Sequence, residues 1–166
     1  MTYPPPGDPY SGQVPPQPYG QSPYGQPAPA FAGWGSRVGA YLIDGLIVAP
    51  FSLLATLLGM STDDVTGLQT PNALYYVFLL AGFVVSGYNR WFQAGKTGQS
   101  WGKKALNIRL LNEATGHPIG AGKAFLRDLA HILDGLACCI GYLWPLWDAK
   151  KQTFSDKVCS TLVVRS

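Results

Sequence analysis

Three apolar runs dominate the pattern of hydrophobic and polar positions along the chain. The first covers residues 38–59, and its only charged member is Asp44. Its length of about 22 residues is enough for a helix to cross the roughly 30 Å hydrocarbon core of a bilayer. The second run covers residues 72–88 and ends beside Arg90 and Trp91, residue types that are common at the membrane interface. These two runs predict two membrane-spanning helices.

The third apolar run, residues 129–147, is less regular, because Asp134 and several Gly and Pro residues interrupt it. Such a run predicts either a single span or a segment that turns back within the membrane. Backbone that turns back at membrane depth must be buried against protein, and small Gly residues permit that packing.

Two shorter stretches have the pattern of β-strands. Apolar residues alternate with polar ones over residues 106–110, residues 161–164 are rich in β-branched side chains, and "NEATG" is typical of a turn. Strands that pair must lie on one side of the membrane, so we favour a third segment that returns the C-terminus to the cytoplasm. The predicted fold class is an all-α membrane protein: a small polytopic helical bundle with two clear spans, a third spanning or re-entrant hairpin segment, and short cytoplasmic strands.

The charges around the runs predict their orientation. Residues 60–70 contain two Asp and no Lys or Arg, whereas residues 90–127 contain seven basic residues. Cytoplasmic loops carry the excess of Lys and Arg, so residues 90–127 and the N-terminus are expected in the cytoplasm. The predicted localisation is the plasma (inner) membrane, with a multi-pass topology. If the third run crossed once, the four basic residues near the C-terminus would lie outside, against the same rule.

The N-terminal residues 1–36 differ from the rest of the chain. They hold ten of the 14 prolines and a single charged residue, Asp8, so they cannot bury enough apolar surface to offset the entropy of ordering. We expect a disordered Pro/Tyr/Gly-rich cytoplasmic tail over residues 1–36 and a transmembrane domain over residues 37–166. The tail serves either as a solvated spacer or as a docking segment for another protein.

A carboxylate inside a membrane segment needs a partner, because a lone charge there costs a few kcal/mol. Asp44 follows Arg37 by two helical turns and lies on nearly the same helix face. The decapeptides "RVGAYLIDGL" and "RDLAHILDGL" share their Arg, Ala, Asp, Gly and Leu positions, which relates Arg127 and Asp134 to the first pair. His131 lies on the helix face of Asp134. The sequence therefore predicts a buried polar cluster of these five residues.

Two interpretations of this cluster remain open. In the first, buried carboxylates exchange a proton for a small cation or polar ligand. In the second, Arg37 pairs with Asp134 and Arg127 pairs with Asp44, and the ion pairs only fix the helix register.

The sequence offers little for other chemistry. Cys138, Cys139 and Cys159 have no metal-ligand spacing, and "GKTGQSWGKK" departs from the phosphate-binding loop pattern. No nucleophile motif is present, so we expect neither an enzyme nor a bound cofactor or metal. The basic loop is explained by topology and not by nucleic-acid binding. At the cytoplasmic membrane surface, Trp101 is expected at the headgroups, with Lys103 and Lys104 on anionic lipid.

The chain resembles the RDD family of small bacterial membrane proteins over residues of about 34–164. The resemblance rests on the Arg and Asp of the first run, on "GQSWGKKALNIRLLNEATGHPIG" and "FLRDL", and on the closing "KKQTFSDKVCSTLVV". It assigns the family arginine to Arg37 and the first family aspartate to Asp44. The second aspartate is either Asp134, which the internal repeat favours, or Asp156, which the closing motif favours. The usual suggestion for this family is transport of ions or other ligands.

The leading hypothesis is thus an integral inner-membrane protein that transports or exchanges a small ion or ligand with its buried Arg and Asp residues. Three short segments are few for a complete pathway, so a site between the subunits of a homo-oligomer is expected. The alternative is a membrane adaptor that transports nothing: its tail recruits envelope or division proteins, and its Arg/Asp cluster is structural.

Overall fold

The computed structural model describes residues 30–136 and 139–166. Within these ranges the chain is mostly helical, with two short antiparallel sheets. The helical elements are α1 (Trp34–Leu58), α2 (Ala73–Gly87), the π-helix η1 (Tyr88–Gln93), α3 (Ala94–Thr97), α4 (Trp101–Ala105), α5 (Ala121–Leu136), α6 (Ile140–Leu143), the 3-10 helix η2 (Trp144–Leu146) and α7 (Phe154–Val158). The strands are β1 (Met60–Thr62), β2 (Gln69–Pro71), β3 (Ile108–Asn112) and β4 (Thr161–Arg165).

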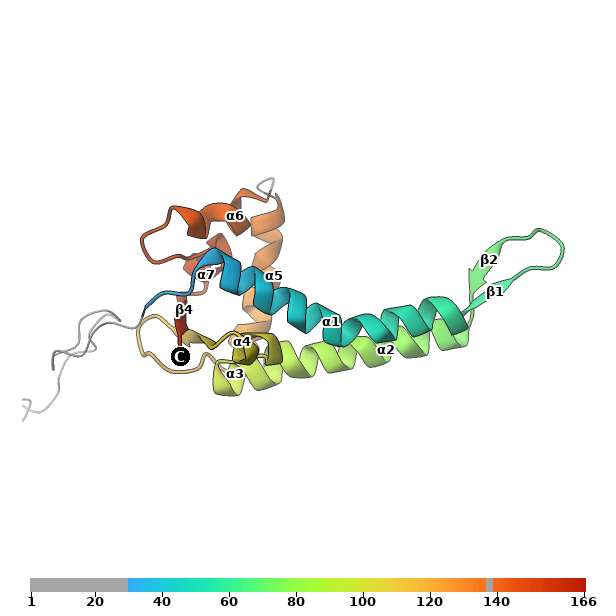
Figure 1. Cartoon of the computed structure of the whole chain (residues 1–166), viewed down its shortest axis with the longest axis horizontal. Coiled ribbons are helices and arrows are strands. Elements are labelled where there is room, and N and C mark those ends of the chain that lie inside the picture. Colours follow the sequence, from blue (N-terminus) through green and yellow to red (C-terminus); the bar gives the residue numbers. More distant parts are fainter. Residues whose placement is uncertain (1–29, 137–138) are drawn as a thin grey trace, which may run out of the picture.

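Helices α1 and α2 form a long hairpin that projects from a head made of the remaining elements (Figure 1). Both helices are apolar, and most of their large side chains are exposed. They approach closely at Gly82, where a Cβ atom would lie 3.0 Å from Cβ of Phe51. By length and composition α1 is able to cross a membrane. An exposed apolar surface of this extent is typical of a surface that contacts lipid or another protein.

The second predicted span begins where the sequence indicates but continues further. Asn72 caps α2 by accepting hydrogen bonds from the backbone N–H groups of Leu74 and Tyr75. The α-helix itself has 15 residues, after which η1 and α3 extend the same rod to Thr97. A π-helical turn of this kind often marks a functional site. The residues between the first two helices, predicted as a loop, form the β1–β2 hairpin at the far tip (Figure 1).

The head is organised around the two strands predicted from the sequence. β3 and β4 pair antiparallel, with Ile108 opposite Arg165 and Asn112 opposite Thr161, so the predicted pairing is confirmed. Their buried residues Ile108, Leu110 and Val163 pack with Ala40 of α1. The sheet therefore connects β3 with β4, which are about fifty residues apart in sequence. The C-terminal strand also lies beside residues 30–32, because the backbone N–H of Arg165 donates to the carbonyl of Ala30.

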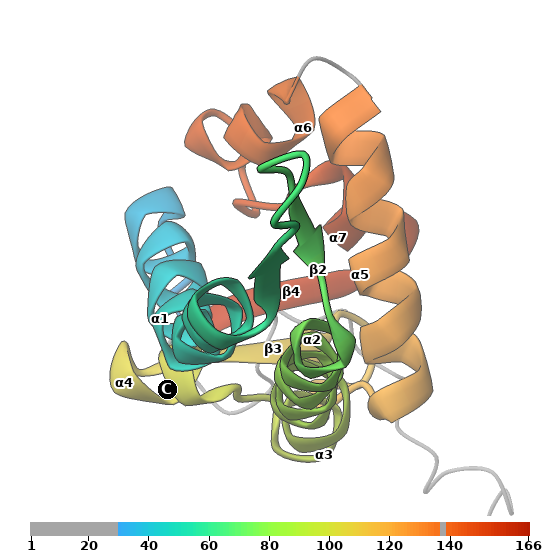
Figure 2. The same ribbon diagram turned by 90° about the vertical axis from the view of Figure 1, so that its right-hand side faces the viewer.

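The third apolar run forms a bent element and not one straight helix. α5 begins at Ala121 and α6 follows at a bend of 108°. Together these helices are apolar enough for a broken span or a re-entrant loop. α5 lies across the direction of the α1–α2 hairpin in both views (Figures 1 and 2). The bend is tight, because a Cβ atom at Gly141 would lie only 2.6 Å from Cα of Asp134.

The predicted tail extends too far into the chain. Residues 1–29 lie outside the described residues, but residues 30–36 belong to the head. Phe31 bridges to Val164, the backbone N–H of Ala32 donates to the carbonyl of Val163 at 2.8 Å, and α1 already begins at Trp34. Residues 31 and 32 thus form a short third segment at the edge of the sheet, beside β4. The head therefore begins before residue 37, the predicted boundary between the tail and the transmembrane domain.

Candidate functional site

Asp156 is positioned by the first turn of α7. The side chain of Thr153 accepts a hydrogen bond from the backbone N–H of Asp156, and the Asp156 carboxylate accepts one from the N–H of Thr153. This reciprocal capping box fixes the start of the short helix. As a result the carboxylate of Asp156, which is 0 % exposed, points into the interior of the head.

Two arginines converge on this single carboxylate. Nη1 of Arg37, from α1, lies 2.5 Å from Oδ2 of Asp156, while Nε and Nη2 of Arg127, from α5, lie 2.8 and 2.7 Å from Oδ1. Thr161 of β4 donates a further hydrogen bond to Oδ1 at 3.1 Å. Burial alone would raise the pKa of Asp156, but Arg127 and Arg37 hold it well below its usual range. The site therefore keeps one carboxylate ionised between two guanidinium groups.

Asp44 is held by neutral donors instead. Its carboxylate accepts hydrogen bonds from Nδ2 of Asn89 at 2.7 Å, from Oγ of Ser100 at 2.6 Å and from the backbone N–H of Gly102 at 2.8 Å. These contacts connect α1 to η1 and α4. Gly102 is needed for them, because a Cβ atom there would lie 2.0 Å from the carbonyl oxygen of Ala40. Asp44 has no ion-pair partner among the described residues.

Asp134 and His131 form a third group at the C-terminal end of α5. Nδ1 of His131 lies 2.6 Å from Oδ2 of Asp134, which confirms that the two residues share a helix face. The other Asp134 oxygen accepts hydrogen bonds from the backbone N–H groups of Phe154 and Ser155 at the start of α7. The ring of His131 stacks on Tyr142 with 5.4 Å between centroids. Asp134 thus anchors α7, the helix that carries Asp156.

A fourth carboxylate, Asp128, was not predicted from the sequence. It accepts hydrogen bonds from Nη2 of Arg90 at 3.0 Å and from Nε1 of Trp91 at 2.8 Å. The guanidinium of Arg90 also lies 5.3 Å from the ring centroid of Tyr41. The signal was present in "FLRDL", where Asp128 directly follows Arg127, but Arg90 was interpreted only as an interfacial anchor.

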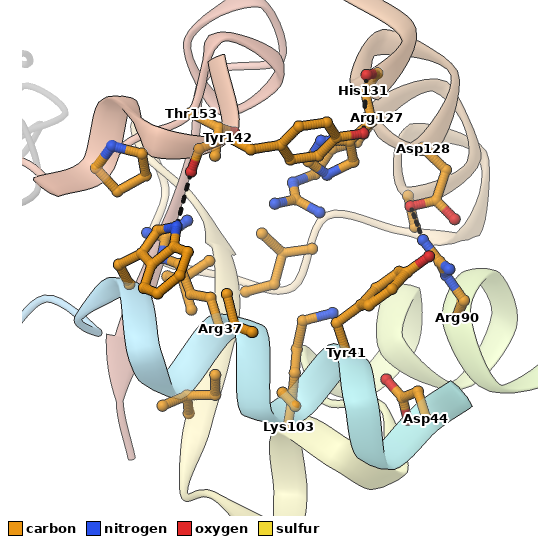
Figure 3. A pocket seen from close by; sticks show the side chains of 18 of the residues that line it. Arg37, Tyr41, Asp44, Arg90, Lys103, Arg127, Asp128, His131, Tyr142 and Thr153 are labelled. Atoms are coloured by element: carbon orange, nitrogen blue, oxygen red, sulfur yellow. Dashed lines mark hydrogen bonds and ion pairs between the residues drawn. The ribbon is translucent and has the colours of Figure 1, made fainter. Parts of the chain in front are cut away.

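A cavity of about 910 Å³ lies between α1, α4, α5 and α6 (Figure 3). Its polar and charged lining residues are Arg37, Asp44, Arg90, Lys103, Arg127, Asp128, His131 and Thr153. Figure 3 shows Lys103 reaching from α4 into the space between Arg37 and Tyr41. Burial and the charge of Arg127 lower the pKa of Lys103 to about 8.

Four of the predicted cluster residues line this cavity, namely Arg37, Asp44, Arg127 and His131, whereas Asp134 and Asp156 do not line it. Arg37 and Arg127 do meet, but they share Asp156, so the predicted cross-pairs with Asp134 and Asp44 are wrong. Lys103, predicted at the membrane surface, lines the cavity, while Lys104 is exposed and Trp101 is half-buried.

The hydrogen-bond inventory of the cavity indicates what it can bind. The oxygens of Asp44 and Asp128, which line the cavity, all accept bonds from protein donors. So do the oxygens of Asp156, which does not line the cavity but pairs with Arg37 and Arg127. By contrast, the buried Nη2 of Arg37 has no hydrogen-bond partner among the described residues, and Nζ of Lys103 makes no bond to any of them. Unfilled donors fit an acceptor, such as an anionic group. The described residues contain no cluster of His, Cys, Asp and Glu that could hold a metal ion.

The chain is similar to mycobacterial proteins that are named as proline-rich antigens. The chain is 35 % identical over 153 residues to the "Proline-rich antigen" of Mycobacterium leprae, covering 82 % of this chain and 61 % of that protein. It is 39 % identical over 89 residues to the "Proline-rich antigen homolog" of Mycobacterium tuberculosis, covering 54 % of this chain and 37 % of that protein. The chain therefore spans less than two thirds of the length of these relatives. No solved structure matches it. The sequence profile of the RDD family matches residues 31–160, which include Arg37, Asp44 and Asp156, and the chain belongs to the RDD family.

Proposed function

We propose that this protein is a multi-pass protein of the bacterial plasma membrane that transports or exchanges a small charged ligand through the cavity of its head. The observation that carries the proposal is the convergence of Arg37, Asp44 and Arg127 on one cavity beside the apolar hairpin. Ionisable residues within a membrane-spanning segment are costly, so Arg37 and Asp44 of α1, which face a cavity, are expected to serve function.

The proposed topology places the α1–α2 hairpin across the membrane and the head on the cytoplasmic side. α2 packs antiparallel to α1, so it reaches the depth that α1 reaches, although its α-helical part has only 15 residues. The β1–β2 tip between the two helices contains Asp63 and Asp64 and no basic residue, whereas the head is basic. This charge distribution supports an N-terminus in the cytoplasm.

The third segment is proposed to lie in the cytoplasmic membrane interface and to return without crossing. β3 and β4 are paired, so the chain is on the same side of the membrane before α5 and after α7. α5 is amphipathic, and its exposed large side chains are all apolar: Phe125, Leu126, Leu129, Ile132, Leu133 and Leu136. A helix with one such face suits the boundary between headgroups and acyl chains. The same pairing supports a cytoplasmic C-terminus.

The ligand is proposed to be an anion. Exchange of a cation at Asp44 would need free carboxylate oxygens, but three protein donors already occupy them. Arg37 and Arg127 share the carboxylate of Asp156, which leaves one positive charge over. Arg90 pairs with Asp128, and Lys103 faces Asp44, so these charges balance each other. Such an excess of positive charge attracts anions and repels cations.

Two further proposals concern partners of the chain: other copies of itself and a protein that binds its tail. The hairpin alone encloses no pathway, so transport would use a homo-oligomer in which hairpins of several copies pack together. The alternative adaptor function depends on the Pro-rich tail, which lies outside the described residues apart from its last few positions.

The proposal is tested by reconstituting the full chain into liposomes and measuring the transfer of Na⁺, phosphate and a fluorescent anionic phospholipid. We expect transfer of a negatively charged probe and none of Na⁺. Lys103→Gln is expected to reduce that transfer, and Lys104→Gln, which changes the neighbouring exposed residue, is the matched control. Transfer of Na⁺ alone, or of no probe by well-inserted protein, would contradict the proposal.

A further inference from the structure

The cavity changes character from its rim to its interior. At the rim, Tyr41, Ile132 and Leu136 are 63, 59 and 74 % exposed, and at the inner end Arg127 and Thr153 are only 8 and 5 % exposed. A soluble ion would gain nothing from an apolar rim. An apolar rim that leads to buried cations matches a ligand with an apolar tail and a charged head.

The rim is continuous with surfaces that are proposed to face lipid. Tyr41 belongs to α1, whose exposed side chains further along include Leu42 and Leu46. Ile132 and Leu136 belong to the apolar face of α5. In the view along the hairpin, α1 and α5 lie on opposite sides with α6 above them (Figure 2). With α5 in the interface, this rim opens toward the acyl chains of the cytoplasmic leaflet.

The size of the cavity supports the same ligand. A volume of about 910 Å³ lies near the upper end of the roughly 300–1,000 Å³ range of small-molecule sites. Inorganic phosphate would fill a small part of it. A glycerophosphate headgroup with the first segment of an acyl chain would occupy far more of the volume.

We propose that the cavity is a binding site for an amphiphile with one anionic headgroup: a lipid or lipid precursor with a phosphate or carboxylate group. This ligand enters laterally from the cytoplasmic leaflet. The anionic group lies among Arg37, Lys103 and Arg127, and the tail leaves between α1 and α5 past Tyr41 and Ile132. This inference rests on the proposed function, since it names the ligand class of the same cavity, but binding is measurable without transport.

The test uses the full chain in detergent micelles and measures bound probes by native mass spectrometry. The probes are phosphatidylglycerol, phosphatidylcholine with the same acyl chains, and soluble glycerol phosphate. We expect phosphatidylglycerol to bind with one molecule per chain, and at least tenfold more tightly than either of the other probes. Lys103→Gln should weaken its binding roughly tenfold through loss of a charged contact, while Lys104→Gln should not.

A second variant tests the rim without touching the charges. Leu136→Gln changes an exposed side chain. It is expected to weaken the binding of phosphatidylglycerol severalfold while leaving folding intact. Equal losses of affinity for phosphatidylglycerol in Lys103→Gln and Lys104→Gln would show unspecific adsorption to the surface and would contradict a binding site in the cavity. Glycerol phosphate that bound as tightly as phosphatidylglycerol would contradict the proposal that the ligand is an amphiphile. Equal binding of phosphatidylcholine would contradict the proposal that the ligand is anionic, and no binding of any probe would contradict both. If phosphatidylglycerol binds through Lys103 but no probe is transferred in liposomes, the site stands and the proposed transport falls.

Discussion

Asp44 and Asp156 are two buried carboxylates that each fix helix α1 to other elements of the head. Asp44 connects α1 to η1 and α4 through an amide, a hydroxyl and a backbone N–H. Asp156 connects α1 to α5 and α7 through two guanidinium groups. The first carboxylate is stabilised by neutral dipoles and the second by opposite charges.

The difference determines what happens when each carboxylate is removed. Loss of the Asp156 charge leaves two arginines buried without a counter-ion, whereas loss of the Asp44 charge leaves neutral donors short of an acceptor. An uncompensated buried charge costs more than an unpaired neutral donor. Asp156 is therefore expected to dominate the stability of the head, and the Asp44 side is expected to be the more adjustable one.

Asp156→Asn should have the largest effect. It keeps the shape of the side chain but removes the charge between Arg37 and Arg127, so the free energy of unfolding is expected to fall by about 3–5 kcal/mol. The measurement is unfolding in micelles followed by circular dichroism. Asp64→Asn, at an exposed position of the hairpin tip, is the control. A loss no larger than that of the control would mean that the two arginines find other partners.

Gly102→Ala tests the Asp44 side. The added methyl group would collide with the carbonyl of Ala40, push α4 from α1 and break the hydrogen bond from Gly102 to Asp44. Overpacking of this kind costs about 1–3 kcal/mol of unfolding free energy. Gly45→Ala is a matched control, because a Cβ atom at Gly45 meets nothing within 4 Å. Equal stability of both variants would show that α4 moves away without cost.

The same comparison shows how far the sequence leads. Alternating apolar residues predicted β3 and β4, and helical spacing placed His131 beside Asp134, because both patterns are local. The partners of Asp44 and Asp156 were not predictable in this way. Arg37 and Asp156 are 119 residues apart, and only the packing of α1, α5 and α7 brings them together. The closing motif "KKQTFSDKVCSTLVV" pointed to Asp156, but the internal repeat of two decapeptides favoured Asp134.

Lys103 illustrates the same limit. A pair of lysines shortly after a tryptophan in a basic loop is typical of a membrane surface, and Lys104 is exposed as that pattern predicts. However, α4 packs on α1 through Gly102, which turns the side chain of Lys103 into the cavity. A difference of one position on a five-residue helix depends on tertiary contacts that no local pattern contains.

Acid should weaken the Asp156 side selectively. The pKa of Asp156 is lowered in the folded state, so its charge stabilises the fold above the ordinary carboxyl pKa near 4, and this contribution is lost as the pH falls toward the lower folded pKa. The free energy difference between wild type and Asp156→Asn should therefore shrink below about pH 4, by up to about 1.4 kcal/mol per pH unit. Unfolding measured from pH 7 to pH 2 checks this. A constant difference would show that geometry and not charge is what the variant removes.

The smallest expected effect is a change of ligand affinity with pH on the Asp44 side, measured as the binding of phosphatidylglycerol between pH 6 and pH 9.5. Lys103, whose pKa is lowered to about 8, is faced by Asp44 from α1, by Arg127 and Asp128 from α5 and by Arg90 from η1. Because Lys103 loses its charge above that pH, binding of the anionic lipid should weaken severalfold as the pH rises through about 8. Lys103→Arg should remove this dependence, since an arginine stays protonated over the whole range, and Lys104→Arg should preserve it. The same pH dependence in wild type and Lys103→Arg would assign it to another group and would separate Lys103 from the ligand.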